Sequence, residues 1–250
     1  MNALERLLAD KFLSLADDEL ILAHRNSEWT GHAPILEEDI AFANIAQDEL
    51  GHATLWYRLR AALTGEEPDE LVFFRDAADF TCAQLVELPK GDWALTIMRQ
   101  YLFDALEMVR LPLYIESGYR PLTETAAKIR PEEIYHYRHT AAWVKRLGWG
   151  TVESHRRMQT ALNELWPYTR QLFAPLPGEA ALIEAGHLPD LTRLEMDWWA
   201  EVEPFLTAAN LTIPAFTKTA VISRTDHTPH LAELVADLQA VARLDREAAW

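Results

Sequence analysis

The sequence contains very little cysteine and glycine, and it has no long uninterrupted apolar run. A single cysteine, Cys82, among 250 residues excludes an internal disulfide and fits a reducing compartment. Only 9 glycines occur and strand-like alternation is rare, which disfavours a β-rich fold. Because no run of about 18 apolar residues occurs, we expect no membrane span. The N-terminus lacks the basic and then apolar pattern of a signal peptide, so we expect a cytoplasmic protein.

Basic residues are also scarce relative to acidic ones. The 39 aspartates and glutamates against 23 lysines and arginines give a formal charge of −16 at pH 7. Nucleic-acid binding needs clustered basic side chains, and an anionic membrane surface repels a chain of this charge. We therefore predict neither nucleic acid nor a membrane as a partner, and we interpret the acidity as an aid to solubility.

The residues that are abundant predict an all-α protein. Apolar residues make up 49% of the chain, with Ala, Leu and Glu dominant. We predict one domain over residues 1–250, with a four-helix bundle over about 3–148 and additional C-terminal helices over about 151–250. The expected helices span about residues 3–29, 36–63, 71–85, 93–114, 151–173, 188–209 and 231–246, together with a fourth long helix that ends near residue 148, and a polar loop is expected over 212–229.

Because of two prolines, the sequence allows more than one boundary for each of the third and fourth long helices. We expect Pro112 to kink the third helix or to end it early, because proline removes a helical hydrogen bond. Pro131 either begins the fourth helix or bends a longer helix that starts near Thr123. Asp92 is a plausible N-cap for the third helix.

Two of these helices contain the same motif, Glu-x-x-His, which places ionisable residues on an otherwise apolar face. Residues three and four apart share one face of a helix. Glu49 and His52 lie on a face that also carries Phe42, Ile45 and Trp56, and Glu133 and His136 lie on a face with Ile129, Thr140 and Trp143. Burying such groups costs several kcal/mol unless they are paired or bind a metal.

The other two long helices each carry one carboxylate on an apolar face. Glu19 lies among leucines and precedes Glu49 by 30 residues, and Glu107 precedes Glu133 by 26 residues. These separations fit two antiparallel helices joined by a short turn. Asp104, one turn before Glu107, is the alternative residue for the third helix.

Together these residues predict a dinuclear metal site. A four-helix bundle with a Glu from each of two helices and a Glu-x-x-His from the other two is the recurring frame of di-iron and di-manganese proteins. Carboxylates and imidazoles suit iron or manganese, and four glutamates balance two divalent cations. The predicted ligands are Glu19, Glu49, His52, Glu107, Glu133 and His136. The alternative interpretation is a buried carboxylate–histidine network without metal.

Several other residues receive simpler interpretations. Asp48 and Glu132 precede the motif glutamates, and we predict that each accepts a hydrogen bond from the histidine of the opposite helix and so fixes its tautomer. Cys82 is interpreted as a small packed hydrophobe. His227 and His230 lie near a loop–helix junction and are interpreted as a cap or surface pair.

Long stretches of the chain resemble the C subunits of ring 1,2-phenylacetyl-CoA epoxidases, ferritin-like components of bacterial phenylacetate degradation complexes. The resemblance covers almost the whole length. It is carried by GHAPILEEDIA at 31–41 and ESHRRMQ at 153–159, together with residues 16–18, 20–22, 24–25, 27–29, 99–100, 102–103, 135–136, 138–139, 143 and 150–151.

The resemblance implies a ferritin-like subunit that pairs with a catalytic A subunit and supports acyl-CoA binding, while a reductase delivers electrons from NADPH. Such C subunits resemble di-iron subunits that have lost their metal. This chain departs from that pattern, because it retains all six predicted ligands. It is therefore expected to be an epoxidase-type monooxygenase subunit with its own di-iron centre.

Two other functions remain open at this point. One is a non-catalytic structural subunit that pairs with a catalytic homologue, and the other is a ferritin-like oxidase or iron-handling protein. The partner is either a catalytic A-type subunit with its reductase or a second copy in a homodimer. Because no glycine-rich strand–helix turn for a flavin or nicotinamide occurs, the electrons must come from a separate reductase.

Overall fold

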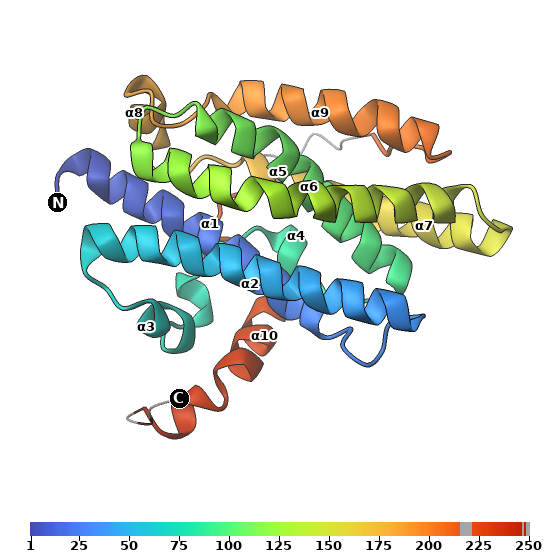
Figure 1. Ribbon diagram of the computed structural model, residues 1–250, viewed down its shortest axis with the longest axis horizontal. Coiled ribbons are helices and arrows are strands. Elements are labelled where there is room, and N and C mark those ends of the chain that lie inside the picture. The colour runs from blue at the N-terminus through green and yellow to red at the C-terminus, as the bar shows by residue number, and fades with distance from the viewer. Residues whose placement is uncertain (216–221, 247, 249–250) are drawn as a thin grey trace. The chain divides into compact units, whose positions relative to one another are not determined.

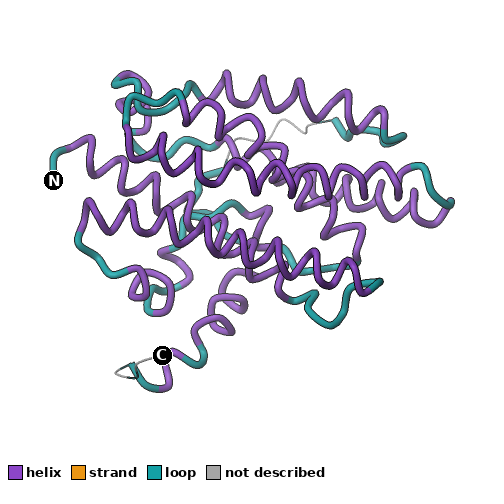
Figure 2. Tube along the Cα trace, viewed as in Figure 1, coloured by secondary structure: helices purple, strands orange, loops and turns teal. Residues whose placement is uncertain are grey.

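The described part of the chain is helical and contains no strand. A computed structural model describes residues 1–215, 222–246 and 248 (Figures 1 and 2). The helices are α1 Ala3–Ser27, α2 Leu36–Thr64, α3 Pro68–Phe73, α4 Gln84–Glu87, α5 Trp93–Ile115, α6 Arg120–Gly148, α7 Val152–Leu165, α8 Glu179–Glu184, α9 Leu191–Ala208 and α10 Pro229–Gln239, and the 3₁₀ segments are η1 Ala77–Asp79, η2 Trp166–Phe173 and η3 Ala242–Leu244. The predicted all-α fold is confirmed.

The chain folds as two compact units. The first comprises Met1–Pro89, Leu176–Glu179 and Ser223–Trp250, and the second comprises Lys90–Pro175 and Ala180–Ile222. Each unit is built around one pair of long helices. The prediction of one domain with its core over residues 3–148 stays a prediction.

In the first unit, α1 and α2 form an antiparallel hairpin. Asn2 caps α1 by accepting a hydrogen bond from the Glu5 N–H, and Glu5 in turn accepts one from the Asn2 N–H. At the far end of α2, Gly65 adopts φ 77°, the left-handed conformation that ends a helix without steric penalty. The hairpin is closed by apolar contacts such as the stacked rings of Phe12 and Trp56, whose centroids lie 6.3 Å apart.

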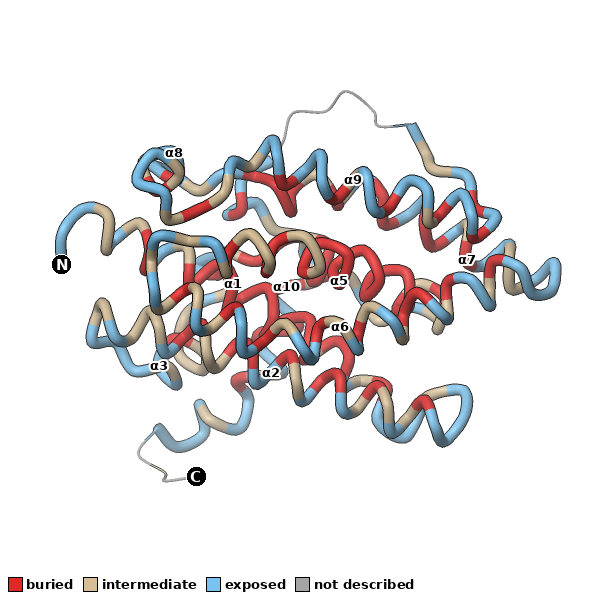
Figure 3. The backbone as a smooth tube through the Cα atoms, turned by 45° about the horizontal axis from the view of Figure 1, so that its top comes forward, coloured by how far each residue is buried: buried red, intermediate tan, exposed pale blue. Residues whose placement is uncertain are grey.

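In the second unit, α5 and α6 form the corresponding hairpin. Asp92 caps α5 as predicted, accepting a hydrogen bond from the Leu95 N–H at 3.0 Å. α5 is buried along much of its length, whereas α2 and α6 alternate between buried and exposed residues (Figure 3). Both helices run through their prolines, Pro112 in α5 and Pro131 in α6, so neither proline begins or ends a helix.

The shorter elements differ from the sequence prediction. The single helix expected over 71–85 is three short pieces, α3, η1 and α4. The helix expected over 151–173 is α7 followed by the 3₁₀ segment η2, which begins at Trp166 with a proline next to it. The last helix ends at Gln239, earlier than residue 246, and α8 was not predicted. Within the loop predicted over 212–229, residues 216–221 lie outside the described residues.

Candidate metal centre

Three predicted ligands converge inside the α1–α2 hairpin. Glu19 projects from α1, and Glu49 and His52 project from α2, each with at most 1% of its surface exposed. The His52 Nδ1 atom lies 3.7 Å from Glu49 Oε2 and 3.9 Å from Glu19 Oε2. Two ligands of one ion, each about 2.1 Å from it, are separated by about 3–4 Å. The spacing of these three donor atoms therefore fits a shared metal ion.

The Glu19 carboxylate is only partly compensated, by His52, within the described part of the chain. Neither of its oxygens has a hydrogen-bond partner among the described residues. Burial raises the pKa of the Glu19 carboxyl well above its ordinary value, Glu49 raises it further, and His52 lowers it less. A cation would relieve both the desolvation and the repulsion between the two carboxylates, so the electrostatics of this cluster fit a metal.

The α5–α6 hairpin carries the second set of predicted ligands. Glu133 and His136 on α6 are fully buried, and His136 Nδ1 lies 3.4 Å from Glu133 Oε1. Asp104 on α5 offers an oxygen within 4.8 Å of a His136 ring nitrogen. Asp104 is oriented by two hydrogen bonds, one from Gln100 Nε2 at 2.7 Å and one from Thr140 Oγ1 at 2.6 Å. Such outer contacts hold a metal ligand in place.

Glu107, the predicted α5 ligand, has a different neighbour. Its Oε1 atom accepts a hydrogen bond from Arg110, one turn later on α5, and both side chains are buried. A guanidinium already supplies the positive charge that a metal would bring, so this ion pair weakens the case for Glu107. The geometry on α5 favours Asp104, the alternative left open by the sequence.

The residues predicted to orient the histidines differ in exposure. Asp48 is half-buried on α2, and Glu132 is exposed on α6. Their predicted hydrogen bonds to the histidines of the opposite helices stay predictions.

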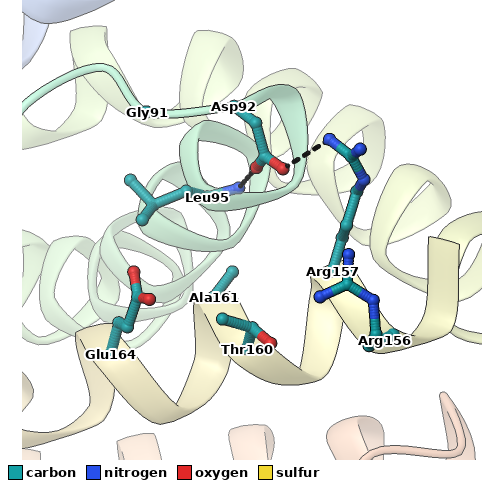
Figure 4. A pocket seen from close by; sticks show the side chains of 8 residues that line it. All are labelled: Gly91, Asp92, Leu95, Arg156, Arg157, Thr160, Ala161 and Glu164. Carbon is teal, nitrogen blue, oxygen red and sulfur yellow. Dashed lines mark hydrogen bonds and ion pairs between the residues drawn. The ribbon is translucent and has the colours of Figure 1, made fainter. Parts of the chain in front are cut away.

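A surface cavity of about 400 Å³ lies at the start of α5 beside α7 (Figure 4). Arg156 and Arg157 line it and resemble an anion site at first sight. However, both guanidiniums bind Glu153, and Arg157 also contacts Asp92 Oδ2 at 3.2 Å. Glu164 adds a further acidic side chain to the lining. The acidic groups match or outnumber the basic ones, so this cavity is a poor site for a phosphate.

The interpretation of His227 as a cap or surface residue is wrong. Its Nδ1 atom lies 2.7 Å from Glu87 Oε1, and its Nε2 atom lies 2.9 Å from the Phe80 carbonyl oxygen. Cys82 contacts the same Glu87 oxygen at 3.7 Å. No sequence pattern signals this cluster, because Glu87 and His227 are 140 positions apart and share no helical period.

Each of the two hairpins pairs a helix that carries a buried acid with a helix that carries a buried Glu-x-x-His, an arrangement that recurs in helical proteins with carboxylate–histidine metal sites. The comparison with known families is more specific. The family described as "Phenylacetic acid catabolic protein" matches residues 2–250, and the chain belongs to this family.

A characterised relative supports the same assignment. The chain is 39% identical over 234 residues to the C subunit of 1,2-phenylacetyl-CoA epoxidase from Escherichia coli (strain K12), and the matched region covers 93% of this chain and 94% of that protein. The resemblance found in the sequence is thereby confirmed. Among the described residues, no helix is both long enough and apolar enough to cross a lipid bilayer.

Proposed function

We propose that this chain is a subunit of a multicomponent oxygenase that epoxidises phenylacetyl-CoA or a related aromatic acyl-CoA, and that it carries its own di-iron centre. The family membership and the name of the Escherichia coli relative support the reaction class. Two buried Glu-x-x-His motifs, each paired with a helix that carries a buried acid, support the metal. Manganese is the alternative metal, because it accepts the same ligands.

The buried Glu19 carboxylate carries the proposal. It lies beside a second carboxylate, Glu49, and neither of its oxygens has a hydrogen-bond partner among the described residues. A protein without metal would gain stability by replacing this residue with an apolar one. Its presence is therefore best explained by a bound cation.

The proposed ligands are Glu19, Glu49 and His52 from the α1–α2 hairpin and Glu133 and His136 from the α5–α6 hairpin, completed on α5 by Asp104 or Glu107. We favour Asp104 because Arg110 pairs with Glu107. When bound, two irons supply the electrons that activate dioxygen for transfer to the substrate. The protein contributes the carboxylates that balance the charge, the imidazoles, and the apolar faces that exclude water.

The proposed partners follow from the same assignment. A catalytic A-type subunit and a separate reductase complete the complex, and association with a second copy is the alternative. The electron donor must be separate because the chain carries no nucleotide-binding fingerprint.

Iron content tests the proposal. Protein produced in iron-replete medium should contain about two irons per chain, the stoichiometry of such carboxylate-bridged sites. Glu49→Ala should remove the iron without unfolding the protein, whereas Glu37→Ala, an exposed position on the same helix, should leave it bound. Wild-type protein that contains no iron and gains no stability from added Fe(II) would contradict the metal centre and leave the structural role beside a catalytic homologue.

Paired variants on α5 identify its ligand. Asp104→Asn should lower the iron content if Asp104 is the ligand, and Glu107→Gln should lower it if Glu107 is. Turnover of phenylacetyl-CoA with a reductase and oxygen, compared with simple oxidation of Fe(II), then separates an epoxidase component from an iron-handling protein.

A further inference from the structure

The cluster of Cys82, Glu87 and His227 lies in the first unit and is distinct from the ligands discussed above. Cys82 precedes α4, Glu87 is the last residue of α4, and His227 precedes α10. One sulfur, one carboxylate oxygen and one ring nitrogen from these residues all lie within 4.8 Å of one another. Cys82 and Glu87 are fully buried, and 12% of the His227 side chain is exposed.

Hydrogen bonds fix the protonation of His227. A carbonyl oxygen can only accept, so the His227 Nε2 atom must carry the hydrogen that it donates to the Phe80 oxygen. On the other side, His227 Nδ1 and Glu87 Oε1 are only 2.7 Å apart. Two lone pairs would repel at this distance, so a proton or a metal ion must lie between the two atoms. In the metal-free protein it is a proton.

The remaining contacts leave the carboxylate well oriented. Glu87 Oε2 accepts hydrogen bonds from Thr228, at 2.6 Å from its backbone nitrogen and 2.7 Å from its hydroxyl. Arg25 binds the Glu87 carbonyl oxygen at 2.7 Å. Glu87 Oε1 thus faces the thiol and the imidazole, and both of these can exchange a proton for a metal ion.

We propose that Cys82, Glu87 and His227 form a binding site for one thiophilic divalent cation, of the Zn²⁺ class, that fastens residues 223–228 to the segment around α4. Thiolate, imidazole and carboxylate are the ligands that zinc takes in proteins. In a tetrahedral site two such ligands are about 3.3–3.7 Å apart. The 3.7 Å between Cys82 Sγ and Glu87 Oε1 already fits, and the Glu87–His227 contact opens by less than about 1 Å.

Charge balance supports the replacement of two protons by one divalent cation. Without metal, a neutral thiol, a carboxylate and an imidazolium sum to zero charge. The binding of Zn²⁺ releases one proton from Cys82 and one from His227, leaving a thiolate, a carboxylate, a neutral imidazole and the cation, which again sum to zero. Burial, followed by Glu87, raises the pKa of the Cys82 thiol, so a thiolate needs a cation beside it. With three protein ligands, a tetrahedral site of this kind takes a water as its fourth ligand.

Cobalt substitution gives a selective readout. Cys82 is the single cysteine of the chain, so any cysteinate-to-cobalt charge-transfer band in the near ultraviolet reports this site. Full-length protein stripped of metal should develop the band with one equivalent of Co²⁺ and lose it when Zn²⁺ is added. Zn²⁺ should also raise the midpoint of thermal unfolding.

Matched variants complete the test. Cys82→Ser should abolish the band and the stabilisation by Zn²⁺. His227→Gln should weaken Co²⁺ binding by at least about tenfold, while His230→Gln, three residues away, should not. Glu49→Ala should keep the band, which separates this site from the proposed iron centre. Wild-type protein without the band at saturating Co²⁺, or an unchanged affinity in His227→Gln, would overturn the proposal, whatever the iron content.

Discussion

Three consecutive acids of α1, Asp17, Asp18 and Glu19, are equally buried but differ in their partners. Asp17 accepts hydrogen bonds from the Tyr57 hydroxyl at 2.7 Å and the Thr81 N–H at 2.8 Å. Successive residues on a helix point about 100° apart, so the three acids face different surroundings. Burial alone therefore does not distinguish a structural acid from a candidate ligand, whereas the hydrogen-bond partners do.

Asp18 shows what a compensated buried acid looks like. It binds Arg224 at 2.6 Å and the Ala83 N–H at 2.7 Å. Glu19, one residue later, has no hydrogen-bond partner among the described residues and faces Glu49 and His52. The first two acids are held by hydrogen bonds and ion pairs within the protein, whereas the third is the one proposed to bind a metal ion.

Removing a compensated acid should have the largest effect on stability. Asp18→Ala leaves the Arg224 guanidinium buried without its carboxylate, so we expect the free energy of unfolding to fall by about 3–5 kcal/mol. Urea unfolding followed by circular dichroism measures this loss.

A double variant sharpens this prediction. Asp18→Leu combined with Arg224→Met removes both charges together and should recover much of the lost stability, because an apolar pair of similar volume is tolerated. If Asp18→Ala alone were as stable as the wild type, the distinction between the two kinds of buried acid would fail.

Replacing Glu19 should have the opposite effect on stability in the metal-free protein, because it should raise the free energy of unfolding. Glu19→Leu replaces a buried ionisable group that has no hydrogen-bond partner among the described residues with an apolar side chain, so we expect the free energy of unfolding of the metal-free protein to rise by about 1–2 kcal/mol. The same variant should lose iron. Calorimetry and iron analysis on one preparation test both effects, and a destabilised variant that keeps its iron would refute the proposed role.

The sequence could predict the burial of Glu19, Glu49 and His52, because each lies on an apolar helix face with helical period, and their role as ligands stays a prediction. It could not predict the partners that separate Asp17 and Asp18 from Glu19. Arg224 lies 206 residues from Asp18, and no local pattern connects them. The Cys82–Glu87–His227 cluster was missed for the same reason, since its members meet only through the tertiary fold.

The long helices were predictable and the short ones were not. Helical periodicity over more than 20 residues outweighs a single proline, which is why α5 and α6 continue through Pro112 and Pro131. Between Pro68 and Glu87, by contrast, each piece is at most 6 residues long. At that length tertiary contacts decide the backbone, such as the hydrogen bonds from Gln239 to the carbonyl oxygens of Val72 and Arg75.

A partly compensated acid should show its effect through pH. Burial tends to raise the pKa of the Glu179 carboxyl, but Lys11, 2.6 Å away, lowers it most, and the Leu176 N–H and Arg224 lower it further, so the net pKa is lowered. A lowered pKa contributes stability above the unfolded value of about 4.3, and this contribution is lost as pH falls through the folded value.

We therefore expect Glu179→Gln to be less stable than the wild type by about 1 kcal/mol at pH 7. The difference should shrink as the pH falls below about 4. Thermal unfolding across this range tests the sign, with Glu184→Gln, at the exposed end of α8, as the control. A difference that grows in acid would contradict the assignment of Lys11 as the dominant partner.

The smallest effects on stability are expected at the ion pair between Asp92 and Arg157. Its Oδ1 atom caps α5 through Leu95, and its Oδ2 atom binds the exposed Arg157 (Figure 4). Asp92→Ala should cost about 1 kcal/mol through the lost cap, and Asp92→Asn should keep most of it. Arg157→Ala should leave the unfolding midpoint unchanged, because water replaces an exposed partner. If Arg157→Ala proved as destabilising as Asp92→Ala, the ion pair rather than the cap would stabilise this end of α5. A solvent-exposed partner would then stabilise an acid as effectively as the buried partners of Asp17 and Asp18 do.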